Sequence, residues 1–155
     1  MTAFDRALQL VLRHEGGLVD NPKDPGGLTN FGISQRAYPK LDIRNLTQAD
    51  AAEIYRRDYW EKIHGDDLPE PLAIALFDTA VNVGWPRAIL MLQESLGVTV
   101  DGNIGPQTLA ACARPEALVW FSAARVRFYV ANRNYSVFGL GWIRRTISTA
   151  LEANA

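Results

Sequence analysis

Cysteine and histidine are both scarce in this sequence: one cysteine and two histidines occur among 155 residues. Cys112 has no partner for an intramolecular disulfide, and it lies in an apolar stretch, so we expect a small buried side chain rather than a nucleophile. Zinc sites use cysteine and histidine ligands, and too few are present to form one. The sequence also has no glycine-rich phosphate-binding loop. We therefore expect neither a metal nor a cofactor.

An excess of basic residues is missing as well. The chain has 16 lysines and arginines against 17 aspartates and glutamates, which gives a formal net charge of -1. Binding to nucleic acid requires clustered positive charge, so we exclude nucleic acid as a partner. No apolar run approaches the length of a membrane span, and the N-terminal residues lack the basic region and apolar core of a secretory signal. We expect no stable insertion into a membrane.

The composition that is present is that of an ordinary folded chain. Hydrophobic residues make up 48% and charged residues 21%, and no low-complexity segment or flexible linker interrupts the sequence. A chain of 155 residues is long enough to bury one sizeable core. A single compact unit is therefore the simplest expectation.

The spacing of apolar residues predicts a mainly α-helical protein with one irregular region. Apolar side chains from Phe4 to Leu12 recur at helical spacing, and the pair Gly16-Gly17 ends this helix. Residues 19–40 are rich in turn formers, so we expect loops there, with a small sheet of short strands around residues 28–33. Further helices are predicted over residues 47–63, 72–83, 86–97, from 106, from 115 to about 131, and 142–151.

Glu15 occupies the last turn of the first predicted helix. Hydrolysis of a glycosidic bond requires a carboxylic acid that carries its proton near neutral pH, and such acids normally lie in apolar, partly dry surroundings. Glu15 follows an apolar helix face and precedes two glycines, which leave room for a polymer to approach. It is a candidate general acid, although its position alone is more typical of a polar residue that merely ends a helix.

A second group must hold or activate water, or stabilise the transition state. Asp24 lies nine residues after Glu15, in the turn-rich segment that follows the helix. Thr29 and Asn30 come next and offer a hydroxyl and an amide that can hold a water molecule. The alternatives are an ordinary turn residue for Asp24, and ordinary strand or turn residues for Thr29 and Asn30.

Aromatic rings and amides are the usual means by which proteins bind sugars. The candidates are Tyr55, Tyr59 and Trp60 on one predicted helix, and Asp78, Asn82 and Trp85 on one face of another. Core packing is the alternative for Tyr59 and Trp60, and capping of neighbouring loops is the alternative for Asp78 and Asn82. Trp142 is expected to anchor the last helix rather than to touch a sugar.

Several strings of the sequence closely resemble the signature of glycoside hydrolase family 108. They are HEGG at 14–17, DPGGLTNFGIS at 24–34, YRRDYW at 55–60, DLP at 67–69 and FDTAVNVG at 77–84. Residues 92–98 and 101–109 further resemble the predicted peptidoglycan domain that follows in that family. The resemblance covers nearly the whole chain.

Members of that family are N-acetylmuramidases, found as phage endolysins and as enzymes tied to bacterial secretion. The resemblance implies a lysozyme-like, mainly helical fold and gives Glu15 the role of catalytic acid. The arrangement also resembles the Glu, Asp and Thr triad of phage-type lysozymes, whose aspartate likewise follows the glutamate by nine residues. The threonine of that triad lies one position further along than Thr29, so the resemblance leaves both Thr29 and Asn30 as candidates.

The sequence thus predicts a peptidoglycan hydrolase that cleaves the β-1,4 bond between N-acetylmuramic acid and N-acetylglucosamine. Residues 1–84 are expected to form the catalytic region, and residues 85–155 a helical peptidoglycan-binding-like region packed into the same unit. The alternatives are a lytic transglycosylase and a non-catalytic wall-binding or scaffold protein.

Bacterial peptidoglycan is the expected partner, and the chain is expected to be a monomer. Without an export signal, the protein is expected to be made in the host bacterial cytoplasm. It would then reach the wall in the periplasm through a holin or another route.

Overall fold

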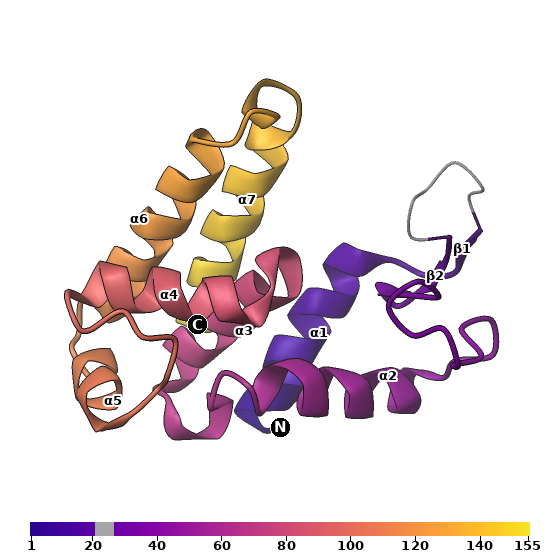
Figure 1. Ribbon diagram of the computed structural model, residues 1–155, viewed down its shortest axis with the longest axis horizontal. Coiled ribbons are helices and arrows are strands. Elements are labelled where there is room, and N and C mark those ends of the chain that lie inside the picture. Colours follow the sequence, from indigo (N-terminus) through magenta and orange to yellow (C-terminus); the bar gives the residue numbers. More distant parts are fainter. Residues whose placement is uncertain (21–26) are drawn as a thin grey trace.

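The computed structural model describes residues 1–20 and 27–155, which form seven α-helices and a small antiparallel sheet (Figure 1). The helices are α1 (Ala3–Glu15), α2 (Gln48–Tyr55), α3 (Glu70–Val83), α4 (Trp85–Leu96), α5 (Pro106–Cys112), α6 (Ala117–Val130) and α7 (Tyr135–Ala153). The strands β1 (Val19–Asp20), β2 (Leu28–Asn30) and β3 (Ile33–Ser34) pair in the order β1-β2-β3. This confirms the predicted class, mainly helical with a short-stranded sheet after the first helix.

The first helix is defined at both ends by local chemistry. Thr2 accepts a hydrogen bond from the backbone N–H of Asp5, and the Asp5 carboxylate accepts one from the backbone N–H of Thr2. At the other end Gly16 adopts a φ of 74°, a left-handed value that glycine reaches without steric cost. Helix α1 therefore ends at Glu15, with the next residues turning away toward β1.

Helix α3 is the centre of the molecule. It packs against α1, α4, α6 and α7, and most of its residues are buried, so it is apolar on nearly every side. The ring of Phe77 on α3 lies edge-on to the rings of Phe4 and Trp60, with centroids 6.0 and 5.5 Å apart. These aromatic contacts join α1 and the segment after α2 to the central helix.

The segment predicted as one helix over residues 47–63 is divided in the structure. Helix α2 ends at Tyr55, a π-helix follows at Arg56–Trp60, and a turn continues to His64, whose φ is 54°. Both Tyr55 and Trp60 are buried. Residues five apart point about 140° away from one another on a regular α-helix, and the wider π turn brings both rings toward the core.

The last helix is longer than predicted, because α7 begins at Tyr135 rather than near Trp142. A side chain at Gly139 would come within 2.4 Å of the Tyr135 ring, so the absence of a side chain there leaves room for the ring. The glycines in this stretch weaken the local helical signal. Packing of α7 against α3 and α6 stabilises the helix instead.

The buried side chains form one continuous hydrophobic cluster that includes members from α1 through α7, among them Phe4, Leu76, Leu92, Phe121 and Ala153. Helices α6 and α7 run side by side and project from this body, and the sheet lies beyond the far end of α1 (Figure 1). Among residues 1–20 and 27–155, no helix combines the length and apolar character that a membrane span needs.

Candidate active site

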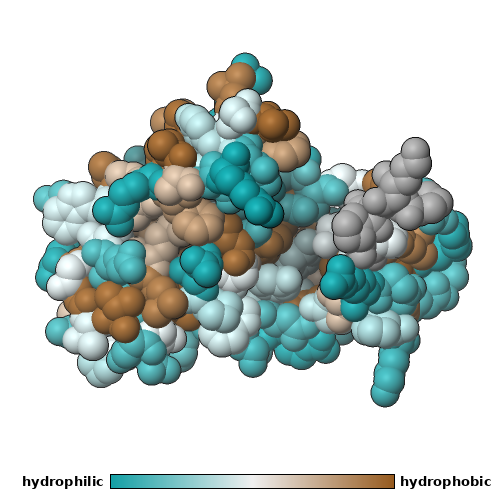
Figure 2. All heavy atoms as spheres, turned by 45° about the horizontal axis from the view of Figure 1, so that its top comes forward, coloured by the Kyte–Doolittle hydropathy of each residue, from teal (hydrophilic) through white to brown (hydrophobic). Residues whose placement is uncertain are grey.

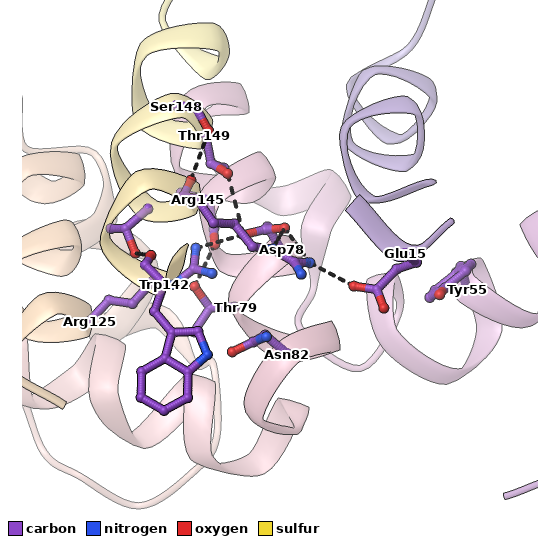
Figure 3. A network of polar contacts seen from close by, with 12 residues as sticks. Glu15, Tyr55, Asp78, Thr79, Asn82, Arg125, Trp142, Arg145, Ser148 and Thr149 are labelled. Atoms are coloured by element: carbon purple, nitrogen blue, oxygen red, sulfur yellow. Dashed lines mark hydrogen bonds and ion pairs between the residues drawn. The ribbon is translucent and has the colours of Figure 1, made fainter. Parts of the chain in front are cut away.

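Glu15 stands where three parts of the chain meet. It is the last residue of α1, it contacts the loop between β2 and β3, and its carboxylate faces α7 (Figure 3). Its side chain is 24% exposed, so the carboxylate is sheltered but open to a ligand. Figure 2 shows the surface hollowed between the α6–α7 hairpin and the end of the molecule that carries the sheet.

Gly32 makes the close approach to Glu15 possible. A side chain at this position would lie 2.8 Å from Glu15 Cβ and 2.7 Å from the hydroxyl of Tyr55, and the φ of Gly32 is 77°. Tyr55 donates a hydrogen bond of 2.8 Å to the carbonyl of Phe31. The turn between β2 and β3 is therefore fixed against the base of the Glu15 side chain.

Arg145 holds the Glu15 carboxylate from the opposite side. Its Nη2 donates to Glu15 Oε1 at 2.9 Å, and its Nε donates to Asp78 Oδ1, also at 2.9 Å. The second oxygen of Asp78 accepts from Arg125 Nη1 at 2.7 Å and from the Thr149 hydroxyl at 3.3 Å. Two carboxylates and two guanidinium groups thus form one charge-balanced network from α1, α3, α6 and α7 (Figure 3).

The acidic and basic groups of this network stabilise one another in their charged forms. Burial by itself would raise the pKa of Asp78, but the guanidinium groups of Arg125 and Arg145 outweigh burial and lower the pKa below its ordinary value. Burial likewise opposes the charge of Arg145, but the carboxylates of Asp78 and Glu15 raise its pKa. The side chains of Asp78 and Arg125 are 1% and 2% exposed, so this part of the network is structural as well as electrostatic.

A second cluster adjoins the network on the side of α6 and α7. The hydroxyl of Tyr129 accepts a hydrogen bond from Arg125 Nε at 3.2 Å and donates one to Asn82 Oδ1. The ring of Tyr129 stacks on the indole of Trp142, with centroids 5.1 Å apart. Asn82 is exposed and Trp142 is partly buried.

The three aromatic residues predicted to bind sugar differ in position. Tyr55 is buried beside Glu15, and burial followed by the Glu15 charge raises the pKa of its hydroxyl. Tyr59 is partly buried, and burial, the Asp58 charge and the Glu15 charge raise its pKa in the same way. Trp60 is 0% exposed and its Nε1 donates to Asp66, so the ring belongs to the core and the prediction of a sugar contact was wrong.

The structure also places the residues expected to hold water. Asn30 is buried, and its Nδ2 donates to the carbonyls of Ile43 and Leu46, so its amide anchors a loop. Thr29 is partly buried on the same strand, and neighbouring strand residues point to opposite faces. Asp24 lies outside the residues that the structure describes.

Asp78, predicted as a cleft residue, is instead buried beneath Arg145 and does not face solvent. There its carboxylate bonds both arginines. Trp85 is partly buried against the core. The sequence analysis missed Arg125 and Arg145. An arginine inside the apolar stretch 117–131 is a signal of a buried ion pair, but nothing local to Arg145 connects it with a residue 130 positions away.

No group of three or more potential metal ligands from histidine, cysteine, aspartate or glutamate occurs in the described ranges 1–20 and 27–155. A hollow of about 710 Å³ lies along another part of α1, lined by residues that include Leu12, Arg13 and Phe31, and Glu15 does not line it. The Glu15 side chain itself is partly exposed, as contact with a polymeric substrate requires.

Family models and a solved structure are similar to this chain. A family model described as Glycosyl hydrolase 108 matches residues 8–84, and one described as Predicted Peptidoglycan domain matches residues 87–147. Among solved structures, SagA of Brucella abortus is similar, with a TM-score of 0.85 and 39% identity over 97% of this chain and 93% of SagA. No curated protein matches the sequence.

Proposed function

The chain belongs to the glycosyl hydrolase 108 family, and on that premise we propose that it is an N-acetylmuramidase of bacterial peptidoglycan. It would cleave the β-1,4 bond between N-acetylmuramic acid and N-acetylglucosamine. The observation that carries the proposal is the position of Glu15, a partly exposed carboxylate at the end of α1 that Arg145 of α7 holds in an ion pair. The matched peptidoglycan domain supports the choice of polymer.

In this proposal Glu15 gives its proton to the glycosidic oxygen while the bond from that oxygen to the anomeric carbon breaks. Positive charge develops on the sugar ring, and water adds to the anomeric carbon and loses a proton to a base. We assign the base to Asp24 and a water-holding role to Thr29, because the Asn30 amide is already bonded to two carbonyls. Water attack on the face opposite the leaving group would invert the configuration.

Arg145 has two functions in this scheme. Its contact with Asp78 does not involve Glu15, so the guanidinium group stays in place whether or not Glu15 carries its proton. When the proton leaves, the same group stabilises the carboxylate that forms. The acid is therefore held in one orientation through the catalytic cycle.

Dye-labelled sacculi provide the test. The parent protein should release soluble fragments, and Glu15→Gln should reduce the rate by about 10²- to 10⁴-fold, because the amide keeps the shape but has no proton to give. Glu94→Gln, at an exposed position outside the site, serves as the matched control and should keep the parent rate.

Release by Glu15→Gln at a tenth of the parent rate would show that Glu15 is not the acid. A parent protein that binds sacculi but releases nothing would favour the non-catalytic wall-binding alternative.

A further inference from the structure

The cluster of Asn82, Tyr129 and Trp142 lies one helical turn from the residues that hold the acid. Asn82 follows Asp78 by four residues on α3, and Trp142 precedes Arg145 by three residues on α7. One turn is about 5 Å along a helix axis. In the view of Figure 3, Asn82 is seen between the indole of Trp142 and Glu15.

The hydrogen bonds of this cluster leave one donor turned outward. The Tyr129 hydroxyl bonds the oxygen of the Asn82 amide and is itself fixed by Arg125. The amide is thereby oriented, and its NH₂ group is the end left for a ligand on an exposed residue. An amide donor of this kind suits the carbonyl oxygen of an acetamido group.

Aromatic rings continue the surface from the amide. The Trp142 indole stacks on Tyr129 at an interplanar angle of 24°. One turn earlier on α7, the ring of Phe138 lies 5.8 Å from Trp142 between centroids and is 55% exposed. Ring faces of this kind cover the C–H side of a pyranose, and a row of them suits a linear glycan.

We propose that Asn82, Trp142 and Phe138 form a sugar subsite for an N-acetylated amino sugar of the glycan strand that Glu15 cleaves. This inference rests on the proposed function and names a substrate contact for it. Trp142 and Phe138 lie within the region matched as a peptidoglycan domain. That region is therefore a wall of the catalytic groove, in addition to any role as an anchor.

Binding is measured with the inactive variant Glu15→Gln and a soluble tetrasaccharide of alternating N-acetylglucosamine and N-acetylmuramic acid. The readout is the indole N–H resonance of each tryptophan in a nitrogen–proton NMR spectrum. The Trp142 signal, identified by its loss in Trp142→Phe, should shift on titration, and the signal of Trp120, an exposed tryptophan on α6 outside this cluster, should stay unchanged. A shift at Trp120 with the Trp142 signal unmoved, or no shift at millimolar glycan, would overturn the subsite.

Substitution of the amide gives the second test. Asn82→Asp keeps the oxygen that Tyr129 bonds and removes only the NH₂ donor, whereas Asn134→Asp adds the same charge at an exposed position near the start of α7. Affinity for the tetrasaccharide should fall about threefold to tenfold in Asn82→Asp and in Phe138→Ala, but not in Asn134→Asp. Unchanged affinity in both test variants would contradict the subsite.

Release of fragments from sacculi by the parent protein reports separately on the proposed function. Intact release combined with unchanged binding in the subsite variants would reject the subsite alone. Absence of release would reject the hydrolase.

Discussion

Arg145 is the side chain that connects Glu15 with the rest of the molecule. It reaches Glu15 from α7 while Asp78 holds its other side, and it is 14% exposed. A shorter side chain at this position would not reach both carboxylates. Orientation of the acid therefore depends on a residue from the opposite end of the chain.

Replacement of Arg145 tests this dependence. Arg145→Met should lower kcat about tenfold to hundredfold with little change in KM, because displacement of a catalytic group by about 1 Å has effects of this size. Arg145→Lys keeps the charge but cannot bond both carboxylates in the same geometry, so it should recover only part of the rate. Arg144→Met, next to it and exposed, is the control. A loss confined to KM would assign Arg145 to substrate binding instead.

Gly32 is the second residue on which the geometry of the acid depends. Gly32→Ala should reduce activity, because the added methyl group would overlap the Glu15 and Tyr55 side chains and the backbone there is left-handed. Gly141→Ala places a methyl group in open space on α7 and should leave the rate unchanged. Steady-state rates on sacculi distinguish the two variants, and equal activity in both would show that the turn does not press on the acid.

At this scale the sequence made Glu15 the candidate acid but did not predict its partners. Its place at a helix end before two glycines was predicted and is confirmed by the structure, whereas its role as the acid rests on the resemblance of the HEGG string and stays a prediction. The partners of Glu15 and Asp78 lie on α6 and α7, and no short-range pattern carries such contacts. Asn30 was ambiguous for a similar reason, since its bonds to the carbonyls of residues 43 and 46 depend on a loop that folds back.

Among the elements, α3, α6 and α7 are joined by the buried ion pairs of Asp78. Its lowered pKa means that the carboxylate is favoured in the folded state. The resulting stabilisation is present above the ordinary pKa of 3.8 and is lost as the pH falls through the lower pKa of the folded state. Helix packing around the site should therefore weaken in acid.

Asp78→Asn measures this contribution. At pH 7 the variant should lose about 3–5 kcal/mol of unfolding free energy, because it leaves the buried guanidinium group of Arg125 without a charge partner and removes one of the two carboxylates that pair with Arg145. The difference from the parent should shrink at pH 3. Urea unfolding at both pH values provides the measurement, and Asp20→Asn, which breaks the exposed pair with Arg44, should change stability little. A difference that does not depend on pH would contradict the assigned role of the Asp78 charge.

Helix periodicity predicted most elements, and the misses have physical causes. Proline at the first turn located the starts of α4 and α5, and Gly97 located the end of α4. The π-helix at Arg56–Trp60 escaped prediction, because α-helical periodicity does not include the wider turn that brings two aromatic side chains toward one core. The first two turns of α7 escaped because Gly139 and Gly141 weaken the helical signal of this stretch.

For the whole molecule, the single hydrophobic cluster predicts cooperative unfolding. Helix α3 contacts elements on both sides of the boundary between the matched regions, and Glu15 and Arg145 bridge the same boundary. Urea unfolding followed by tryptophan fluorescence and by far-ultraviolet circular dichroism should give coincident single transitions. Two separated transitions, or a folded fragment 85–155, would show that the C-terminal part is an independent domain.

The sequence pattern predicted the fold class, but it could not predict how the helices pack against one another. Periodicity gives which face of a helix is apolar, but several packings can bury the same faces. The resemblance supplied the lysozyme-like fold, and the similarity to SagA confirms it. The groove between the α6–α7 hairpin and the sheet, where we place catalysis, follows from that arrangement.

The central claim is that Glu15 directs hydrolysis of the muramic acid bond, and the ends of the products test it most directly. Purified sacculi are digested with the parent protein and with Glu15→Gln, and the fragments are analysed by mass spectrometry before and after borohydride reduction. The account predicts reducing N-acetylmuramic acid ends, each gaining the mass of two hydrogens on reduction, in the parent digest only. Anhydro-muramic acid ends, or reducing N-acetylglucosamine ends, would contradict it.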